Sequence, residues 1–261
     1  MRQPSPLSYA YAIGRVRALE NFLVPREVFA EAAAAEDFIP AMKTIYDAGR
    51  FSEKFLEVRT PEGLDELLEG EAKTVFGLME ELLLQRDIYE ILLSEADPQK
   101  ALAFAENIGS PFITDFLRHK VDLANIKIFF RAKYLGFPKE RLNPLLRRGG
   151  FQVSDIFLER FDLSLAEFGA RLPSSSYKEL IEKAARALTE KETFAGLERG
   201  IEDFLMAYLR RAKYFVFGPE PVFAYGLARQ MEIALIRMVG IGKLNRIPAE
   251  VLRERMGATY V

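Results

Sequence analysis

His119 is the only histidine of this 261-residue chain, which contains no cysteine. It lies between Arg118 and Lys120, with Asp115 and Asp122 about one helical turn away on either side. No second histidine or thiol can join it as a metal ligand or as a member of a catalytic triad. We therefore interpret His119 as an exposed residue on the surface of a helix, and we expect no catalytic residue, no metal and no cofactor.

Two other patterns resemble functional motifs only weakly. Gly240-Ile241-Gly242-Lys243 has the composition of a phosphate loop, but it lacks the GxxxxGK[ST] spacing and follows a helix instead of a strand. We interpret it as a helix end. Carboxylate pairs such as Glu80-Glu81, and Glu66 and Glu69 with Glu71 nearby, fall on the polar faces of amphipathic helices, where solvation is the simplest explanation.

Basic and aromatic residues gather near the ends of predicted helices. The basic runs 145–148 and 210–213 are typical of charged helix ends, although each could contact an acidic partner. An aromatic set surrounds a Gly-Pro-x-Pro break, and it predicts core packing or, alternatively, a contact surface or shallow groove. The set consists of Tyr208, Tyr214, Phe215, Phe217, Phe223 and Tyr225.

The elements that must position these residues contain an internal repeat. The stretch from Pro111 to Leu142 returns from Pro221 to Leu252 at an offset of 110 residues without a gap, with eight identical positions. Each copy predicts a long helix, a break and a second helix that begins after a proline, Pro138 or Pro248. A fainter third copy surrounds Pro25. The repeats extend roughly over residues 8–83, 84–142 and 197–252.

Apolar residues at helical spacing, with almost no alternation of period two, predict an all-α chain of ten to fourteen helices. Each repeated helix carries an acid and a base five residues apart, Asp122 with Lys127 and Glu232 with Arg237. Five residues correspond to about 140° around a helix, so these charges cannot pair with each other along one face. We expect each acid to meet a base of a neighbouring helix, or alternatively another subunit.

The overall charge and hydropathy restrict the class of partner. A net charge of −2 gives no electrostatic reason to expect nucleic acid or an anionic membrane surface as the main partner. No apolar run approaches the roughly 20 residues of a membrane span, and the N-terminus has no signal-peptide pattern. The chain is expected to be soluble or peripheral, and the absence of cysteine fits a cytosolic setting.

Several motifs together resemble the C subunit of V/A-type rotary ATPases, the counterpart of the d subunit of eukaryotic vacuolar ATPases. They are Tyr9-Ala10-Tyr11-Ala12 with Arg15-Val16-Arg17-Ala18, Asp122-Leu123 with Asn125-Ile126-Lys127, Arg131-Ala132-Lys133, Phe217-Gly218-Pro219-Glu220-Pro221, Glu232-Ile233 with Ile236-Arg237, Gly242-Lys243-Leu244-Asn245, Arg253-Glu254-Arg255 and the ending Tyr260-Val261. Each motif is weak alone, but their order along the whole chain is specific.

The resemblance implies a single domain over residues 1–261 in which three pseudo-repeated helical lobes surround a central funnel-like cavity. It implies a non-catalytic adaptor of the central stalk, peripheral on the cytoplasmic face of the membrane. Its partners would be the central shaft subunits and the membrane proteolipid ring. Basic residues near the repeat breaks are our candidates for partner contacts: Arg131, Lys133, Lys243 and Arg246.

The chain departs from the family pattern in two ways. It is shorter than is usual for the family, and Asn125 of the middle copy is replaced by Ile13 and Leu235 in the others. Two alternatives stay open. A helical repeat scaffold for an unrelated protein would offer a groove open along one side. An all-α enzyme would have a deep cavity with converging titratable groups.

Overall fold

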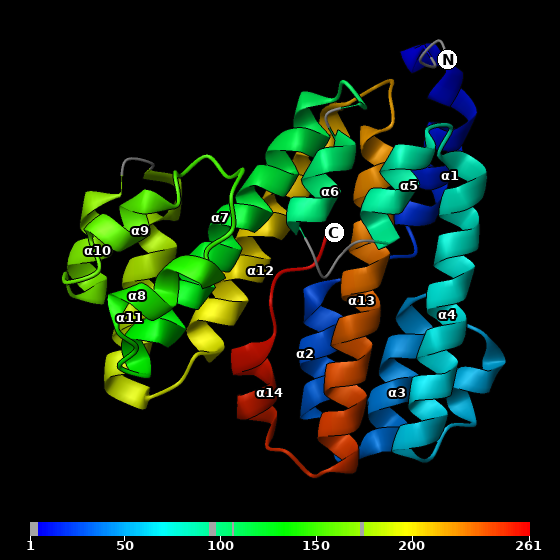
Figure 1. Ribbon diagram of the computed structural model, residues 1–261. Helices are drawn as coiled ribbons and strands as arrows, with labels where there is room; N and C mark the ends of the chain where they lie inside the picture. The colour runs from blue at the N-terminus through cyan, green and yellow to red at the C-terminus, as the bar shows by residue number, and fades with distance from the viewer. Residues whose placement is uncertain (1–4, 94–97, 106, 173–174) are drawn as a thin grey trace. The chain divides into compact units, whose positions relative to one another are not determined.

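The computed structural model describes residues 5–93, 98–105, 107–172 and 175–261, and within these ranges the chain forms fourteen α-helices and no strand (Figure 1). The all-α prediction is therefore confirmed. The chain divides into two compact units. Unit 1 comprises Met1–Leu92 together with Met206–Val261, and unit 2 comprises Leu93–Leu205.

Unit 1 is organised around its longest helix, α13, which extends over Glu220–Leu244. This helix packs against α1 (Ala10–Glu20), α2 (Arg26–Ala34), α3 (Phe38–Ala48) and α4 (Pro61–Leu82) (Figure 1). The unit also contains α5 (Arg86–Leu93) up to Leu92 and α14 (Ala249–Arg255). Because α13 has neighbours on several sides, its sequence is apolar almost all round, with Phe223, Ile236 and Val239 fully buried.

The glycines of α13 serve this packing. A Cβ atom at Gly240 would lie 2.5 Å from Leu64 Cδ2 of α4 and 3.4 Å from Phe38 of α3. Only glycine lets the three helices approach this closely. Residues 240–243 lie inside the helix, which confirms that this segment is the end of a helix and no phosphate loop.

Unit 2 contains α6 (Pro98–Ala105), α7 (Pro111–Tyr134), α8 (Lys139–Leu142), α9 (Asp155–Glu159), α10 (Leu165–Arg171), α11 (Lys178–Lys191) and most of α12 (Ala195–Arg210). Its core holds three phenylalanine rings in contact. The ring centroid of Phe129 lies 4.2 Å from that of Phe168 and 5.9 Å from that of Phe157. A capping box formed by Ser164 and Glu167 begins α10.

The two long helices end in the same way, as the repeat predicts. Gly136 after α7 and Arg246 after α13 are equivalent positions, and both adopt left-handed backbone, with φ of 63° and 55°. The next residue in each copy donates its N–H to a carbonyl five residues back, Phe137 to Ala132 at 2.9 Å and Ile247 to Gly242 at 2.8 Å. This is the Schellman geometry of a helix C-terminus. The helix, turn and proline-initiated helix of the repeat are thus confirmed in both copies.

Candidate functional site

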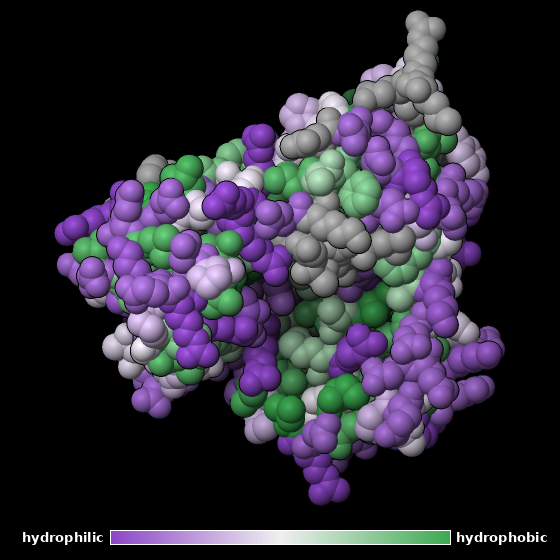
Figure 2. All heavy atoms as spheres, viewed as in Figure 1, coloured by the Kyte–Doolittle hydropathy of each residue, from purple (hydrophilic) through white to green (hydrophobic). Residues whose placement is uncertain are grey.

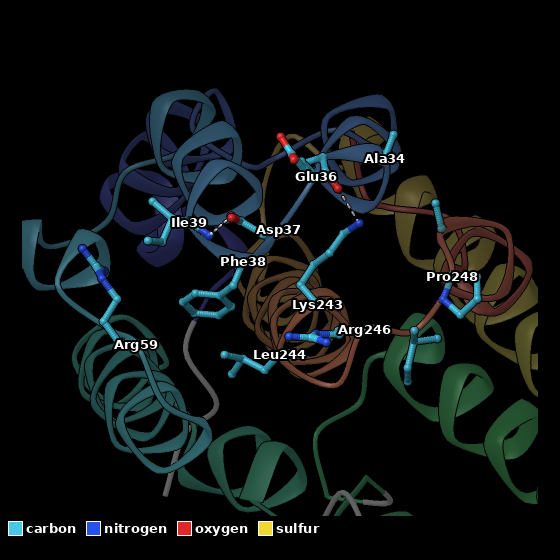
Figure 3. Close-up of a pocket in the computed structure, with 13 residues that line it drawn as sticks. Ala34, Glu36, Asp37, Phe38, Ile39, Arg59, Lys243, Leu244, Arg246 and Pro248 are labelled. Atoms are coloured by element: carbon cyan, nitrogen blue, oxygen red, sulfur yellow. Dashed lines mark hydrogen bonds between the residues drawn. The ribbon is translucent and has the colours of Figure 1, made fainter.

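A pocket of about 660 Å³ opens in unit 1 at the C-terminal end of α13, and we name it the end pocket (Figure 3). Its walls come from the connection between α2 and α3, from the residue before the cap of α4, and from the turn between α13 and α14. The lining residues are Ala34, Ala35, Glu36, Asp37, Phe38, Ile39, Arg59, Lys243, Leu244, Arg246, Ile247, Pro248 and Ala249.

The sequence positions these walls by local rules. The Asp37 carboxylate caps α3 by accepting the backbone N–H of Ile39 at 3.0 Å, which fixes the turn between α2 and α3. On the other side, the left-handed residue Arg246 reverses the chain after α13, and Pro248 begins α14. Figure 3 shows Lys243 and Arg246 together at the end of α13, facing the start of α3.

Two of the four predicted contact residues line this pocket. Lys243 is half-buried, and its Nζ donates to the carbonyl oxygen of Ala35 at 2.7 Å. An ammonium group carries three hydrogens, so this bond leaves further donor capacity. Arg246 is exposed, and in the described part of the chain its guanidinium makes no hydrogen bond or ion pair.

The other two predicted residues lie in unit 2 and are engaged within it. Arg131 pairs with Glu198 of α12 at 2.9 Å. Lys133 donates to the carbonyl oxygen of Phe161 at 2.7 Å. The structure therefore brings Lys243 and Arg246 to one pocket and does not bring Arg131 and Lys133 to it. Partner binding by all four stays a prediction.

The equivalent lysines reveal a contact that the sequence did not predict. Lys133 reaches a carbonyl just after the short helix α9, and Lys243 reaches one just after the short helix α2. At the opposite ends of these short helices, the equivalent acids accept backbone N–H groups. Asp122 accepts those of Phe151 and Gln152 at 3.1 and 3.0 Å.

In unit 1, Glu232 accepts the N–H of Val24 at 2.6 Å, just before α2. Each long helix thus holds a short helix at both ends, through an acid and a lysine that are eleven positions apart on the long helix. We name this arrangement the helix clamp. The repeat contained the signal for it, because position 133 and its equivalent 243 are both lysine and positions 122 and 232 are both acidic.

The expectation that the repeated acids pair with bases of neighbouring helices is wrong for both acids. Asp122 is fully buried and accepts hydrogen bonds from backbone N–H groups and from the hydroxyl of Tyr177. Burial raises the pKa of Asp122 to about 6, and the hydrogen bonds limit the rise. Glu232 bonds Val24 and Arg229, and Arg229 lies on its own helix.

The repeated bases, in contrast, pair with acids of neighbouring helices. Lys127 pairs with Glu198 of α12 at 3.0 Å, and Arg237 pairs with Asp65 of α4 at 2.8 Å. Both pairs are largely exposed. The reason for the difference is depth: the acids lie in the interior, where backbone donors reach them, and the bases lie at the rim, where charged side chains from other helices meet.

The prediction that His119 is an exposed surface residue is also wrong. Its ring is partly buried, its Nδ1 lies 2.6 Å from the hydroxyl of Tyr177, and it contacts the rings of Phe151 and Phe204. Since Tyr177 also bonds Asp122 at 2.9 Å, the three side chains form one hydrogen-bonded chain in unit 2. Tyr177 is almost fully buried. This series of hydrogen bonds joins α7 to the start of α11 and is not open to solvent at Tyr177.

Asn125 has a role in only one copy of the repeat. Its amide accepts the N–H of Arg147 and donates to the carbonyl of the same residue, each at 2.8 Å, which fixes the basic run 145–148 against α7. Ile13 and Leu235 are buried apolar residues. The three copies therefore share no polar role at this position.

The aromatic set around the Gly-Pro-x-Pro break is divided. Tyr208, Phe223 and Tyr225 are buried, as core packing predicts. Tyr214 is 87% exposed and Phe217 48% exposed, so these members fit the alternative prediction of a contact surface.

A second concavity of unit 1 contains a buried cluster of charged side chains. It has a volume of about 420 Å³, and its walls include Tyr225, Glu71 and Arg229. Arg229 donates to both Glu232 and Glu71, and this places Glu71 in a nearly buried ion pair, where the sequence predicted a solvated carboxylate. Arg229 thus holds two carboxylates, those of Glu71 and Glu232, beside this cavity.

Within the described ranges, no group of three or more acidic, histidine or cysteine side chains could hold a metal ion. In the same ranges, no helix is both long and apolar enough to cross a membrane. Figure 2 shows hydrophilic residues over most of the visible face of α8 to α11, with apolar residues scattered among them.

Comparison with known proteins identifies the family. The family model for the ATP synthase (C/AC39) subunit matches residues 31–255, which is most of the chain and includes both copies of the helix clamp apart from Val24 and residues 26–30 of α2. The chain belongs to this family. The resemblance drawn from the sequence motifs is confirmed.

Similar proteins within this ATP synthase (C/AC39) family come from bacteria and archaea. The C subunit of the V-type sodium ATPase of Enterococcus hirae is 26% identical over 155 residues, 59% of this chain and 47% of that protein. The C subunit of the A-type ATP synthase of Desulfurococcus is 27% identical over 148 residues, 56% and 39% of the two chains. That of Methanothermobacter thermautotrophicus is 23% identical over 237 residues, 78% and 60% of the two chains. The matched part of this family member therefore spans between 39 and 60% of the length of these relatives.

Proposed function

We propose that this chain is a non-catalytic adaptor in the central stalk of a V/A-type rotary ATPase. In this role it is a socket that couples the rotating shaft to the membrane proteolipid ring during ATP-driven ion transport or ATP synthesis. The observation that carries the proposal is the family match over residues 31–255. The names of the relatives, all C subunits of a V-type or A-type complex, support it.

The construction of the two units suits such a role. An element that transmits torque must resist deformation, and close-packed helices with interdigitated side chains have low compressibility. In unit 1, α13 is surrounded by four helices, and in unit 2 the rings of Phe129, Phe157 and Phe168 fill the core. The helix clamps add polar bonds at both ends of α2 and α9.

The proposal places the chain at the cytoplasmic face of the membrane, between two protein partners. The three-lobed, funnel-shaped arrangement belongs to this proposal as well. It would be checked by an experimental structure of the assembled complex, in which shaft density enters the middle of the chain.

Co-purification with the shaft and ring subunits tests the function. We expect the full chain to bind the purified shaft subunits and the detergent-solubilised ring, and to bridge the two in one complex. Removing the chain from the assembled enzyme should leave ATP hydrolysis by the head and abolish ion transport, and adding it back should restore coupling. A chain that binds neither shaft nor ring would contradict the proposal.

A further inference from the structure

The end pocket is lined by three cations that have no carboxylate partner in the described part of the chain: Lys243, Arg246 and Arg59, which donates only to the backbone carbonyls of Leu56 and Val58. The contrast with the rest of α13 is clear. Arg229 pairs with Glu71 and Glu232, and Arg237 pairs with Asp65. Among the residues that the structure describes, Lys243 near the end of α13 bonds only the carbonyl oxygen of Ala35, and the guanidinium of Arg246 has no partner.

The backbone at Arg246 gives a second, independent observation. Its φ of 55° is left-handed, and the equivalent position of the repeat holds Gly136 with φ of 63° and the same hydrogen-bond pattern. Glycine adopts this conformation without the steric cost that any side chain brings. Unit 2 therefore shows which residue the turn itself prefers. An arginine held in a disfavoured conformation indicates that its side chain is used.

The chemistry of the walls restricts what the pocket can receive. A guanidinium presents a planar fork of donors that matches a carboxylate or a phosphate. Beside it lie apolar groups, of which Ile39 is 50% exposed and Leu244 and Ile247 are partly buried. The acids Glu36 and Asp37 also line the pocket, and the whole chain has a net charge of −2, both of which disfavour a polyanion.

We propose that the end pocket binds an acidic side chain of a protein partner, an aspartate or glutamate with an apolar residue next to it on the same face. Arg246 and Lys243 receive the carboxylate, and Ile39 and Leu244 contact the apolar neighbour. The inference rests on the proposed function for the nature of the partner, a member of the same rotary complex. Figure 3 shows Lys243 and Arg246 on one wall of the pocket and Ile39 on another.

Carbodiimide coupling in the assembled complex tests the contact directly. This reagent joins an ammonium group to a carboxylate that touches it, and mass spectrometry identifies the joined peptides. We expect Lys243 to be coupled to an aspartate or glutamate of the shaft or of the ring. Coupling of Lys243 only to Glu36 or Asp37 of its own chain, in a complex that has assembled, would overturn the proposal.

Three variants measure the contribution of the guanidinium. Arg246→Gln removes the charge and retains the strained backbone. Arg246→Gly removes the charge and relieves the strain, so weakened binding by this variant could not result from poor folding. Arg255→Gln is the matched control, since Arg255 is exposed in the same unit and does not line the pocket.

We expect both Arg246 variants to bind the partner at least about tenfold more weakly than the wild type, and Arg255→Gln to bind as the wild type does. Unchanged affinity of both Arg246 variants would overturn the pocket proposal and leave the adaptor function standing. A wild-type chain that binds neither shaft nor ring would contradict the function as well. Binding to vesicles of phosphatidylcholine and phosphatidylserine that is lost in Arg246→Gln would assign the pocket to a lipid phosphate instead.

Discussion

The carboxylate of Glu232 accepts the backbone N–H of Val24 at 2.6 Å, although 208 positions separate the two residues in the sequence. This bond joins α13 to the segment that leads into α2. The same carboxylate also bonds Arg229. Unit 1 therefore joins two segments that are far apart in the sequence, because α2 from the first segment is held by α13 from the second.

Replacing Glu232 by glutamine tests how much this junction stabilises unit 1. The change leaves the buried Arg229 with one carboxylate, Glu71, in place of two. Breaking a buried ion pair from one side costs about 3–5 kcal/mol. Because Arg229 still pairs with Glu71, we expect a loss below this range in the free energy of unfolding, measured by urea denaturation. Asp65→Asn is the control, because the exposed pair of Asp65 with Arg237 should contribute less than about 1 kcal/mol. Equal losses in the two variants would show that the junction has no special role.

Replacing Arg246 by glycine should stabilise the chain. The left-handed backbone at this position costs a non-glycine residue about 1 kcal/mol, which glycine does not incur. We expect the free energy of unfolding to rise by about that amount, seen as a higher melting temperature. The reciprocal variant Gly136→Arg should lower it by about 1–2 kcal/mol. A destabilised Arg246→Gly variant would mean that the guanidinium supports the fold.

Asp122 should make stability depend on pH in a definite direction. Its pKa in the folded chain is about 6, against 3.8 for the free side chain, because burial disfavours the charged form. Between about pH 4 and pH 6 the folded chain holds a proton on Asp122 that the unfolded chain has lost. The stability that this group contributes is therefore present at low pH and is lost as the pH rises through that window.

We expect the difference in unfolding free energy between the wild type and Asp122→Asn to fall across this window by at most about 3 kcal/mol. The measurement is urea denaturation at a series of pH values. Burial, with Asp203 and Glu198 nearby, also raises the pKa of Glu202 to about 7, so a fall that persists in Asp122→Asn up to pH 7 is assigned to Glu202. A difference that does not change with pH would contradict the buried, proton-binding state of Asp122.

The phenylalanine core should carry much of the stability of unit 2. Phe129 is fully buried and contacts the rings of Phe157 and Phe168. Its replacement by alanine removes these contacts and leaves a cavity, which costs about 3–5 kcal/mol. We expect faster hydrogen exchange at the amides of α7 and α11. Val153, which is 71% exposed, provides the control, since Val153→Ala should change little. Unchanged exchange in α7 would place the stabilising core elsewhere.

The sequence predicted the elements well where local rules decide them. The ends of α7 and α13 and the starts of α8 and α14 lie where the break and the proline of each repeat copy placed them. The repeat also predicted that positions 133 and 243 are equivalent. In the structure both lysines donate to the backbone carbonyl oxygen of a residue that follows a short helix.

The sequence predicted the burial and the partners of individual side chains less well. His119 was expected to be exposed because its neighbours in the sequence are charged, yet the rings of Phe151, Tyr177 and Phe204 surround it. Similarly, Asp122 was expected to meet a base, and it meets backbone donors. In both cases the partners lie about 30 to 85 positions away along the chain, where no periodic pattern of the helix itself can indicate them.

The sequence by itself determined that the chain is helical, where its long helices end and which positions of the repeat correspond, because backbone hydrogen bonding and side-chain spacing act over a few residues. Only the tertiary structure decided which short helix each long helix holds, which charges are buried and that Lys243 and Arg246 share one pocket. Those outcomes depend on how distant segments fill space against each other, and many packings satisfy the same local pattern.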